Sequence, residues 1–289
     1  MISSAESLES TIAVVGIVKN IEKNMKQDVS QIKSALSRFG KIKWFLVESN
    51  STDDSQKVLR EMSATDENFH FTSISSGSTQ ESRILGMADG RNRYLQELRE
   101  NQTFFDCEYV AVADFNGLND LLNQKAIDSC FVRQNWDVCC ANQNGPYYDI
   151  WALRHPLWSP NDCWQEHEFL RQYIKYPERA LYAAVQSRMI KIPKNSDWLE
   201  VDSAFGGFAI YKREIMLKST YSAFDNDGNI ICEHVPFHNT LRNLGARIFI
   251  NPAMINTKFT DHNSATKFKN KILRQLMYPI KYFWKMNAQ

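Results

Sequence analysis

The sequence has no apolar run long enough to cross a membrane, and no basic cluster opens it. The longest early apolar run, residues 12–18, holds seven residues including a glycine, whereas a membrane-spanning helix needs about 20. Residues 1–10 contain two glutamates and no lysine or arginine, so we expect no signal peptide there. The six cysteines show no CxxC spacing, which argues against a zinc site or a disulfide framework. We therefore expect a cytoplasmic protein with reduced thiols.

Glycine and proline are sparse, and the net charge is almost zero. With 11 glycines and 8 prolines among 289 residues the chain is no fibrous repeat, and 43% apolar with 12% aromatic residues excludes intrinsic disorder. A formal net charge of +1 argues against nucleic acid as the main partner. Six of the 34 basic residues and none of the 33 acidic ones lie from Lys267 onward, so a basic tail follows a mildly acidic body.

Short apolar runs alternate with segments of helical periodicity in the first half of the chain. Residues 11–18, 44–47 and 109–113 have the apolar composition of buried strands. Residues 28–39 and 82–98 lie between them and have the pattern of helices. This alternation predicts an α/β fold of the Rossmann-like type, a doubly wound, mostly parallel sheet with helices on both faces.

Polar residues directly follow each predicted strand. Lys19 and Asn20 come after the first strand, Glu48 after the second and Asp114 after the third. Because ligands bind at the carboxyl ends of strands in such sheets, we expect these residues to line one site. Asp114 and Asn116 could direct a carboxylate and an amide at one hard cation, which in turn holds a diphosphate. An Asx turn that closes the strand explains the same residues.

The segment after the second predicted strand is rich in hydrogen-bond acceptors. Glu48, Asn50 and Asp53 stand where the ribose or base of a nucleoside would lie in such a sheet. Ser51, Thr52 and Asp53 are also good N-cap residues for the helix that follows. A helix cap does not explain Glu48 and Asn50.

Two further segments could meet a ligand. Arg91 shares a helix face with Arg83, eight residues earlier, and such cations suit phosphate, although arginines on solvated helix faces are common. Asp202 precedes the adjacent glycines Gly206 and Gly207. Adjacent glycines before a strand let a ligand approach the backbone closely, and a plain turn is the competing explanation.

The most informative stretch opens a short predicted helix with a carboxylate and an imidazole. Glu233 and His234 begin this helix, which is expected to end at Gly245, and the strand of residues 247–250 after it is expected to end in Asn251-Pro252. The pair suits general-base work or the stabilisation of developing positive charge. His238, one turn further, is expected to be structural. His262 lies in a polar loop, either as a third metal ligand or as a solvated side chain.

In this order, the pieces resemble a GT-A glycosyltransferase that uses a nucleotide sugar. More narrowly, the chain is similar to the fungal capsule-associated mannosyltransferase family and its bacterial surface-polysaccharide relatives, over roughly residues 12–260. The segments that carry the resemblance are Glu48-Ser-Asn-Ser-Thr-Asp53, Gly90-Arg-Asn-Arg-Tyr-Leu95, Asn119-Asp120, Tyr148-Asp-Ile-Trp-Ala-Leu-Arg154, Gly206-Gly207, Cys232-Glu-His234 and Asn251-Pro252.

The resemblance implies a part for each candidate residue. Asp114, Asn116 and His262 would hold Mn²⁺ or Mg²⁺ against the diphosphate of a UDP- or GDP-hexose, with Asn116 replacing the usual second aspartate. Many inverting relatives have Glu-Asp where this chain has Glu233-His234, and the capsule-type family is retaining, so we expect retention. Glu233, His234 and Asp202 would be catalytic. The nucleotide sugar would also meet Lys19, Asn20, Glu48, Asn50, Asp53, Arg91, Gly206 and Gly207.

Residues 263–289 are expected to form a basic, aromatic, amphipathic tail behind a transferase domain of residues 1–262. Basic side chains interleaved with aromatic ones suit a helix lying in an anionic membrane interface, near a lipid-linked acceptor. A helix that docks on its own domain is the alternative.

We thus expect a cytoplasmic enzyme, peripheral to the membrane, that adds a hexose to a surface glycan such as capsule or the lipopolysaccharide O-antigen. Two other functions stay open. A sugar-phosphate nucleotidyltransferase would share the sheet, but residues 11–20 lack its Gly-rich loop. An inactive glycan-binding or scaffold protein is the other, because Asn116 is neutral.

Overall fold

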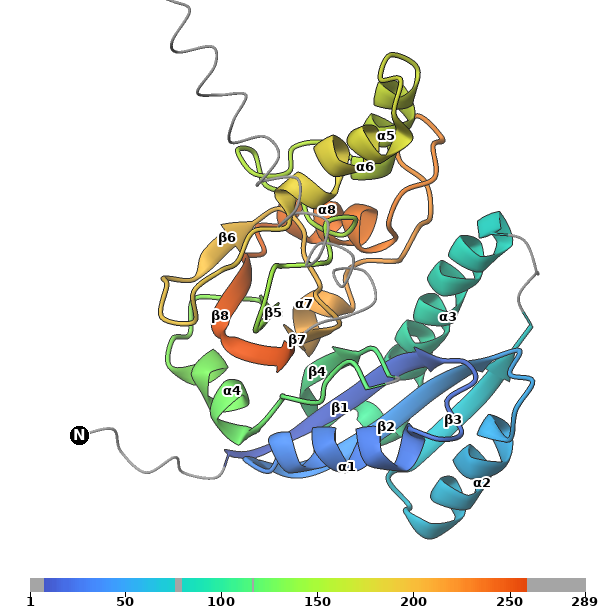
Figure 1. Ribbon diagram of the computed structural model, residues 1–289. Coiled ribbons are helices and arrows are strands. Elements are labelled where there is room, and N and C mark those ends of the chain that lie inside the picture. The colour runs from blue at the N-terminus through green and yellow to red at the C-terminus, as the bar shows by residue number, and fades with distance from the viewer. Residues whose placement is uncertain (1–7, 76–79, 116, 259–289) are drawn as a thin grey trace, which may run out of the picture.

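A computed structural model of the protein describes residues 8–75, 80–115 and 117–258 (Figure 1). Within these residues, one sheet has the strand order β3-β2-β1-β4-β7-β5-β8-β6. β1 pairs in parallel with β2 and β4, β2 with β3, and β5 with β8, whereas β7 and β6 run antiparallel to their neighbours. The predicted mostly parallel α/β sheet is therefore confirmed. The strands are β1 (Leu8–Val18), β2 (Phe39–Ser49), β3 (Phe69–Ile74), β4 (Cys107–Ala113), β5 (Val138–Gln143), β6 (Leu199–Val201), β7 (Phe208–Lys212) and β8 (Ile248–Thr257).

Helices cover both faces of the sheet and enclose two cores. Ile12 and Val14 of β1 pack in the core that contains α1, while Ala13 and Val15 pack in the core that contains α3 and α8. This is the alternation expected of a strand buried on both sides. No helix among the described residues is long and apolar enough to cross a membrane. The helices are α1 (Met25–Ala35), α2 (Ser55–Thr65), α3 (Gln80–Glu100), α4 (Gln124–Asp128), α5 (Cys163–Arg171), α6 (Pro177–Ala184), α7 (Arg213–Met216) and α8 (His234–Asn243), with short 3-10 turns at Gln102–Phe104, Ser129–Phe131 and Gln186–Arg188.

Several predicted boundaries were wrong, and two of them have an identifiable physical cause. The first helix ends at Ala35 rather than at residue 39, because a turn closed by Phe39 N–H and the Leu36 carbonyl (3.0 Å) leads directly into β2. The last strand does not end at Pro252 but continues to Thr257. Its pairing with β5 shifts register in this region, and such an irregularity lets the sheet tolerate a proline, which cannot donate to the ladder.

The carboxyl ends of β1, β2 and β4 lie next to one another, as the sequence predicted. Asn20 ties the first two loops together: its N–H donates to Ser51 Oγ (3.0 Å) and its Oδ1 accepts from Thr52 N–H (2.8 Å). The end of β4 meets the start of β7, since Asp114 N–H donates to the Gly207 carbonyl at 2.9 Å. Segments from both halves of the chain thus meet at this edge of the sheet.

Candidate active site

Asp114 presents a reachable carboxylate at the end of β4. Its side chain stays 37% exposed although the residues around it are buried. Burial raises the pKa of Asp114 to about 7; the nearby Arg91 opposes this shift, whereas Asp149 and Glu233 add to it. A cation close to Asp114 would therefore stabilise the charged form of a carboxylate that its surroundings disfavour.

Arg91 of α3 is buried and lies between the carboxylates of Glu233 and Asp114. Its Nε donates to Glu233 Oε1 at 2.8 Å, and its Nη2 lies 3.8 Å from Asp114 Oδ1. The guanidinium also faces the rings of Phe205 (5.2 Å) and Tyr221 (5.7 Å). Burial alone would lower the pKa of Arg91, but the negative groups around it raise this pKa well above its usual value, so the side chain stays charged. Arg91 is therefore no solvated helix arginine.

The two histidines of α8 have different surroundings. His234 is 2% exposed, stacks on Phe205 at 4.2 Å between ring centroids, and neither of its ring nitrogens has a hydrogen-bond partner within the described chain. Burial lowers the pKa of His234 well below its usual value, so the ring is neutral. His238 is paired on both nitrogens, with Ser203 Oγ and Tyr211 Oη at 2.9 Å each, which fits the structural part predicted for it.

Gly206 and Gly207 sit where no larger residue fits. Both have positive φ, 75° and 84°, and a Cβ would lie 2.8 Å from the Ala141 carbonyl at the first glycine and 2.7 Å from Tyr148 Oη at the second. Asp149 Oδ2 accepts from Gly206 N–H at 2.8 Å. The glycines thus permit close packing against Tyr148 and Asp149. Sequence reasoning gave these two residues no part in the site, and their only signal was their presence in the segment 148–154.

Glu48 and Asp53 shape the loop between β2 and α2. Glu48 is fully buried, and its two oxygens accept from Ser51 N–H (2.6 Å) and Gln56 Nε2 (2.8 Å). Burial would raise the pKa of Glu48, but these hydrogen bonds outweigh it and lower the pKa. Asp53 accepts from the N–H of Ser55 at 3.0 Å, where α2 begins. Local hydrogen bonds therefore account for both side chains.

Among the predicted site residues of the two loops, Lys19, Asn20 and Asn50 are exposed. Asn20 and Asn50 have positive φ, 52° and 49°, a conformation uncommon in residues other than glycine. These side chains, rather than that of Glu48, lie where a ligand can meet the loops.

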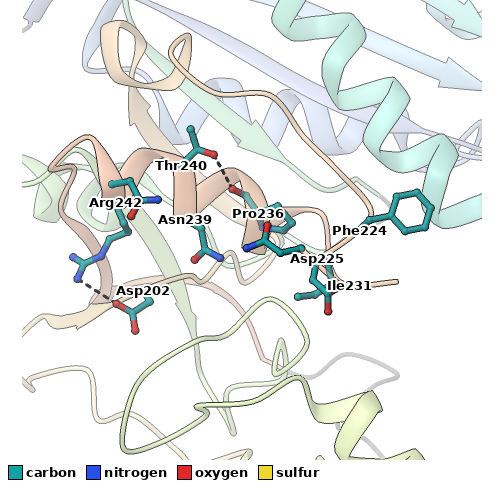
Figure 2. Close-up of a pocket in the computed structure, with 10 residues that line it drawn as sticks. Asp202, Phe224, Asp225, Ile231, Pro236, Asn239, Thr240 and Arg242 are labelled. Atoms are coloured by element: carbon teal, nitrogen blue, oxygen red, sulfur yellow. Dashed lines mark hydrogen bonds and ion pairs between the residues drawn. The ribbon is translucent and has the colours of Figure 1, made fainter. Parts of the chain in front are cut away.

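Of the other predicted residues, Asp202 does not belong to this cluster. Asp202 lies in a groove beside α8, with its carboxylate 3.2 Å from Arg242 Nη2 (Figure 2). Asn116 and His262 lie outside the described residues.

The donors near Asp114 fit a cation that is shared with a ligand. Within the described part of the chain, no group of three or more His, Cys, Asp or Glu side chains could hold a metal ion. Mg²⁺ is usually bound by one or two carboxylates together with substrate phosphates rather than by a cage of protein ligands. The reachable carboxylate of Asp114, whose charged form a nearby cation would stabilise, fits this kind of binding.

No family model and no curated protein matches the sequence. Similar solved structures include a mannosyltransferase of Pyrobaculum calidifontis in complex with GDP-Man and Mn²⁺ (12% identity, TM-score 0.49, covering 96% of this chain and 64% of that one). They also include residues 1–349 of S. aureus TarS with UDP-GlcNAc (12% identity, TM-score 0.44, covering 88% of this chain and 61% of that one). A third is glucosyl-3-phosphoglycerate synthase of Mycobacterium tuberculosis with Mn²⁺, UDP and phosphoglyceric acid (11% identity, TM-score 0.42, covering 96% of this chain and 82% of that one). The chain thus spans about three fifths of the first two structures. At these low scores, the function of this chain rests on its own site.

Proposed function

We propose that this protein is a GT-A glycosyltransferase that moves a hexose from a UDP- or GDP-sugar to a glycan. The observation that carries the proposal is the meeting of Asp114 with the buried Arg91–Glu233 pair at the carboxyl ends of the parallel strands. This edge is where doubly wound sheets bind nucleotides. The edge combines the carboxylate of Asp114, which favours a bound cation, with the fixed positive charge of Arg91. A diphosphate leaving group needs both positive charges.

The nucleoside would lie on the exposed side chains of Lys19, Asn20 and Asn50, in loops that Glu48 and Asp53 hold in shape. Asp114 would hold Mn²⁺ or Mg²⁺, which would compensate the negative charge of the diphosphate. Asn116 and His262 would provide further ligands to this cation. The packed backbone at Gly206 and Gly207 would frame the sugar.

Glu233 acts in this proposal by positioning Arg91. Its Oε1 already accepts from Arg91 Nε at 2.8 Å, so this carboxylate is committed to Arg91 and is not placed as a base for an acceptor hydroxyl. Arg91, fixed in this way, stabilises negative charge that develops on the leaving diphosphate. His234, neutral and with unpaired nitrogens within the described chain, can hydrogen-bond a sugar hydroxyl. We accordingly propose retention, which NMR of the product anomer tests.

The acceptor would be a surface glycan, such as capsule or O-antigen, and residues 263–289 would bring the enzyme to an anionic membrane surface. Truncation after Ala265 should then move the protein from the membrane fraction to the supernatant. Unchanged partitioning would refute this part of the proposal and leave the reaction untouched.

The reaction is tested by nucleoside diphosphate release from a panel of UDP- and GDP-sugars, with Mn²⁺ and a mixture of glycans. We expect release with one donor, its loss in Asp114→Asn, and normal release in Asp197→Asn, a matched change at an exposed aspartate. Pyrophosphate release from a nucleoside triphosphate and a sugar 1-phosphate would instead support a nucleotidyltransferase. No release of either kind would support an inactive glycan-binding protein.

A further inference from the structure

A polar groove runs along the exposed side of α8. It has a volume of about 640 Å³, within the range of about 300–1,000 Å³ found for small-molecule sites. Figure 2 shows the ion pair of Asp202 and Arg242 toward one end, Asn239 between, and Pro236 with the loop of Phe224, Asp225 and Ile231 toward the other. The remaining lining residues are Asn226, Thr240 and Asn243.

One end of the groove is formed by residues that neighbour the proposed reaction centre in the chain. Pro236 belongs to the first turn of α8, whose first residue is His234, and Ile231 lies just before Glu233 in the chain. From Pro236 to Asn243 the helix rises about 10 Å at 1.5 Å per residue. A chain of sugars that follows the groove would thus have one end near Glu233 and His234.

The loop that forms one wall is held by its own hydrogen bonds. Asp225 Oδ1 accepts from the N–H groups of Asp227 (3.0 Å) and Asn229 (2.8 Å), and Asp225 Oδ2 accepts from Gln165 Nε2 of α5 (3.2 Å). Asp225 is therefore occupied with the loop and with α5. The wall is preformed, which reduces the conformational entropy that a ligand would have to remove.

The groups left for a ligand are neutral amides and an apolar surface. Asn239 and Asn243 are exposed on α8, and their side chains have no hydrogen-bond partner among the described residues. Each amide offers both a donor and an acceptor, which is what a hydroxyl group needs. Phe224, Ile231 and Pro236 give an apolar wall. Arg242, the one cation among the lining residues, is already paired with Asp202, so the lining offers no unpaired positive charge to a phosphate.

We infer that this groove binds the neutral, hydroxyl-rich end of an oligosaccharide acceptor, with sugar hydroxyls on Asn239 and Asn243 and the apolar faces of sugar rings on Phe224 and Pro236. The inference rests on the proposed function and deepens it, since it assigns the acceptor to neutral oligosaccharides rather than to small phosphorylated compounds.

The test measures sugar binding by saturation-transfer difference NMR on the full chain. The probes are mannobiose, maltotriose and N,N′-diacetylchitobiose, with mannose 6-phosphate as the anionic comparison. We expect at least one neutral probe to bind more tightly than mannose 6-phosphate. Its affinity should fall by about tenfold in Asn239→Ala/Asn243→Ala, as the loss of two net hydrogen bonds predicts. Both sites are exposed and helical, where alanine is well tolerated, so the variant should fold.

The matched control is Asn195→Ala, an exposed asparagine outside the groove lining, which should bind the probe like the wild type. Binding of none of the neutral probes, equal binding by the double variant, or preference for mannose 6-phosphate would overturn the inference. A thermal-shift assay with the UDP- and GDP-sugars, with and without Mn²⁺, is run in parallel on the same proteins to detect donor binding. A donor shift without groove binding refutes only this inference, whereas groove binding without any donor shift refutes the proposed transferase and leaves the groove as a glycan-binding site.

Discussion

Replacement of Arg91 by methionine should destabilise the protein strongly, because it leaves the buried carboxylate of Glu233 without its partner. The side chains are 4% and 1% exposed, and Arg91 Nε lies 2.8 Å from Glu233 Oε1. Removal of one partner from a buried ion pair costs about 3–5 kcal/mol, since the other charge stays in the core uncompensated. Arg91→Met also removes the contacts of the guanidinium with Phe205 and Tyr221. We expect a loss of about 4 kcal/mol in the free energy of unfolding.

Urea unfolding at neutral pH measures this loss, and a double-mutant cycle isolates the pair. Arg91→Met/Glu233→Leu replaces both charges by apolar groups and should recover stability, with a coupling energy above about 2 kcal/mol. Arg93→Met is the control on the same helix. The Arg93 side chain is 39% exposed, and its Nη2 lies 3.6 Å from Glu97 Oε2 in a surface ion pair. The free energy of unfolding should therefore fall by no more than about 0.5 kcal/mol in this variant. A loss at Arg91 no larger than at Arg93, or additive effects in the cycle, would show that Arg91 and Glu233 do not form a buried pair on which stability depends.

Three further predictions concern Asp114, Gly207 and His238. The pKa of Asp114 in the folded protein, about 7, exceeds its usual 3.8, so the free energy of unfolding falls as pH rises between these values. Asp114→Asn should therefore stabilise the ligand-free protein at pH 8 by about 1 kcal/mol, a figure reduced because the carboxylate is partly exposed. At pH 4 the variant should melt at the same temperature as the wild type. Gly207→Ala should cost about 2 kcal/mol or more in urea unfolding, because φ is 84° and the new Cβ would lie 2.7 Å from Tyr148 Oη. Burial lowers the pKa of His238 from 6.5 to about 3, so between these values only the unfolded chain gains a proton at this residue. The free energy of unfolding, measured with urea, should therefore fall by about 2 kcal/mol between pH 6.5 and pH 5. His238→Gln should remove this part of the pH dependence.

Local patterns in the sequence were sufficient for the first strands and for the polar edge that they form. Residues 11–18 and 109–113 fall within β1 and β4, because continuous apolar runs bounded by polar turns leave few other structures open. Asp114 and the loops after β1 and β2 followed from this order alone, since parallel strands end at one edge of the sheet.

The partners of the site residues could not be predicted, because they depend on contacts between distant segments. Arg91 and Glu233 are 142 residues apart, and the spacing of Arg91 and Arg83 on one helix face indicated only a phosphate site or a solvated surface. Burial of Arg91 is decided by the rings of Phe205 and Tyr221, which no local pattern connects to α3. The loop bonds of Glu48 were missed for a different reason: the backbone N–H of Ser51 carries no signal in the sequence.

Isothermal titration calorimetry of the donor sugars, with and without Mn²⁺, tests directly whether this protein binds a nucleotide sugar at the edge of the sheet that carries Asp114. We predict that one UDP- or GDP-hexose binds in the presence of Mn²⁺, that its affinity falls sharply when Mn²⁺ is withheld, and that Asp114→Asn loses the Mn²⁺-dependent part while Asp197→Asn keeps it. Donor binding that is equal in Asp114→Asn and in the wild type, or no donor binding under either metal condition, would contradict the assignment of this edge of the sheet as a nucleotide-sugar site.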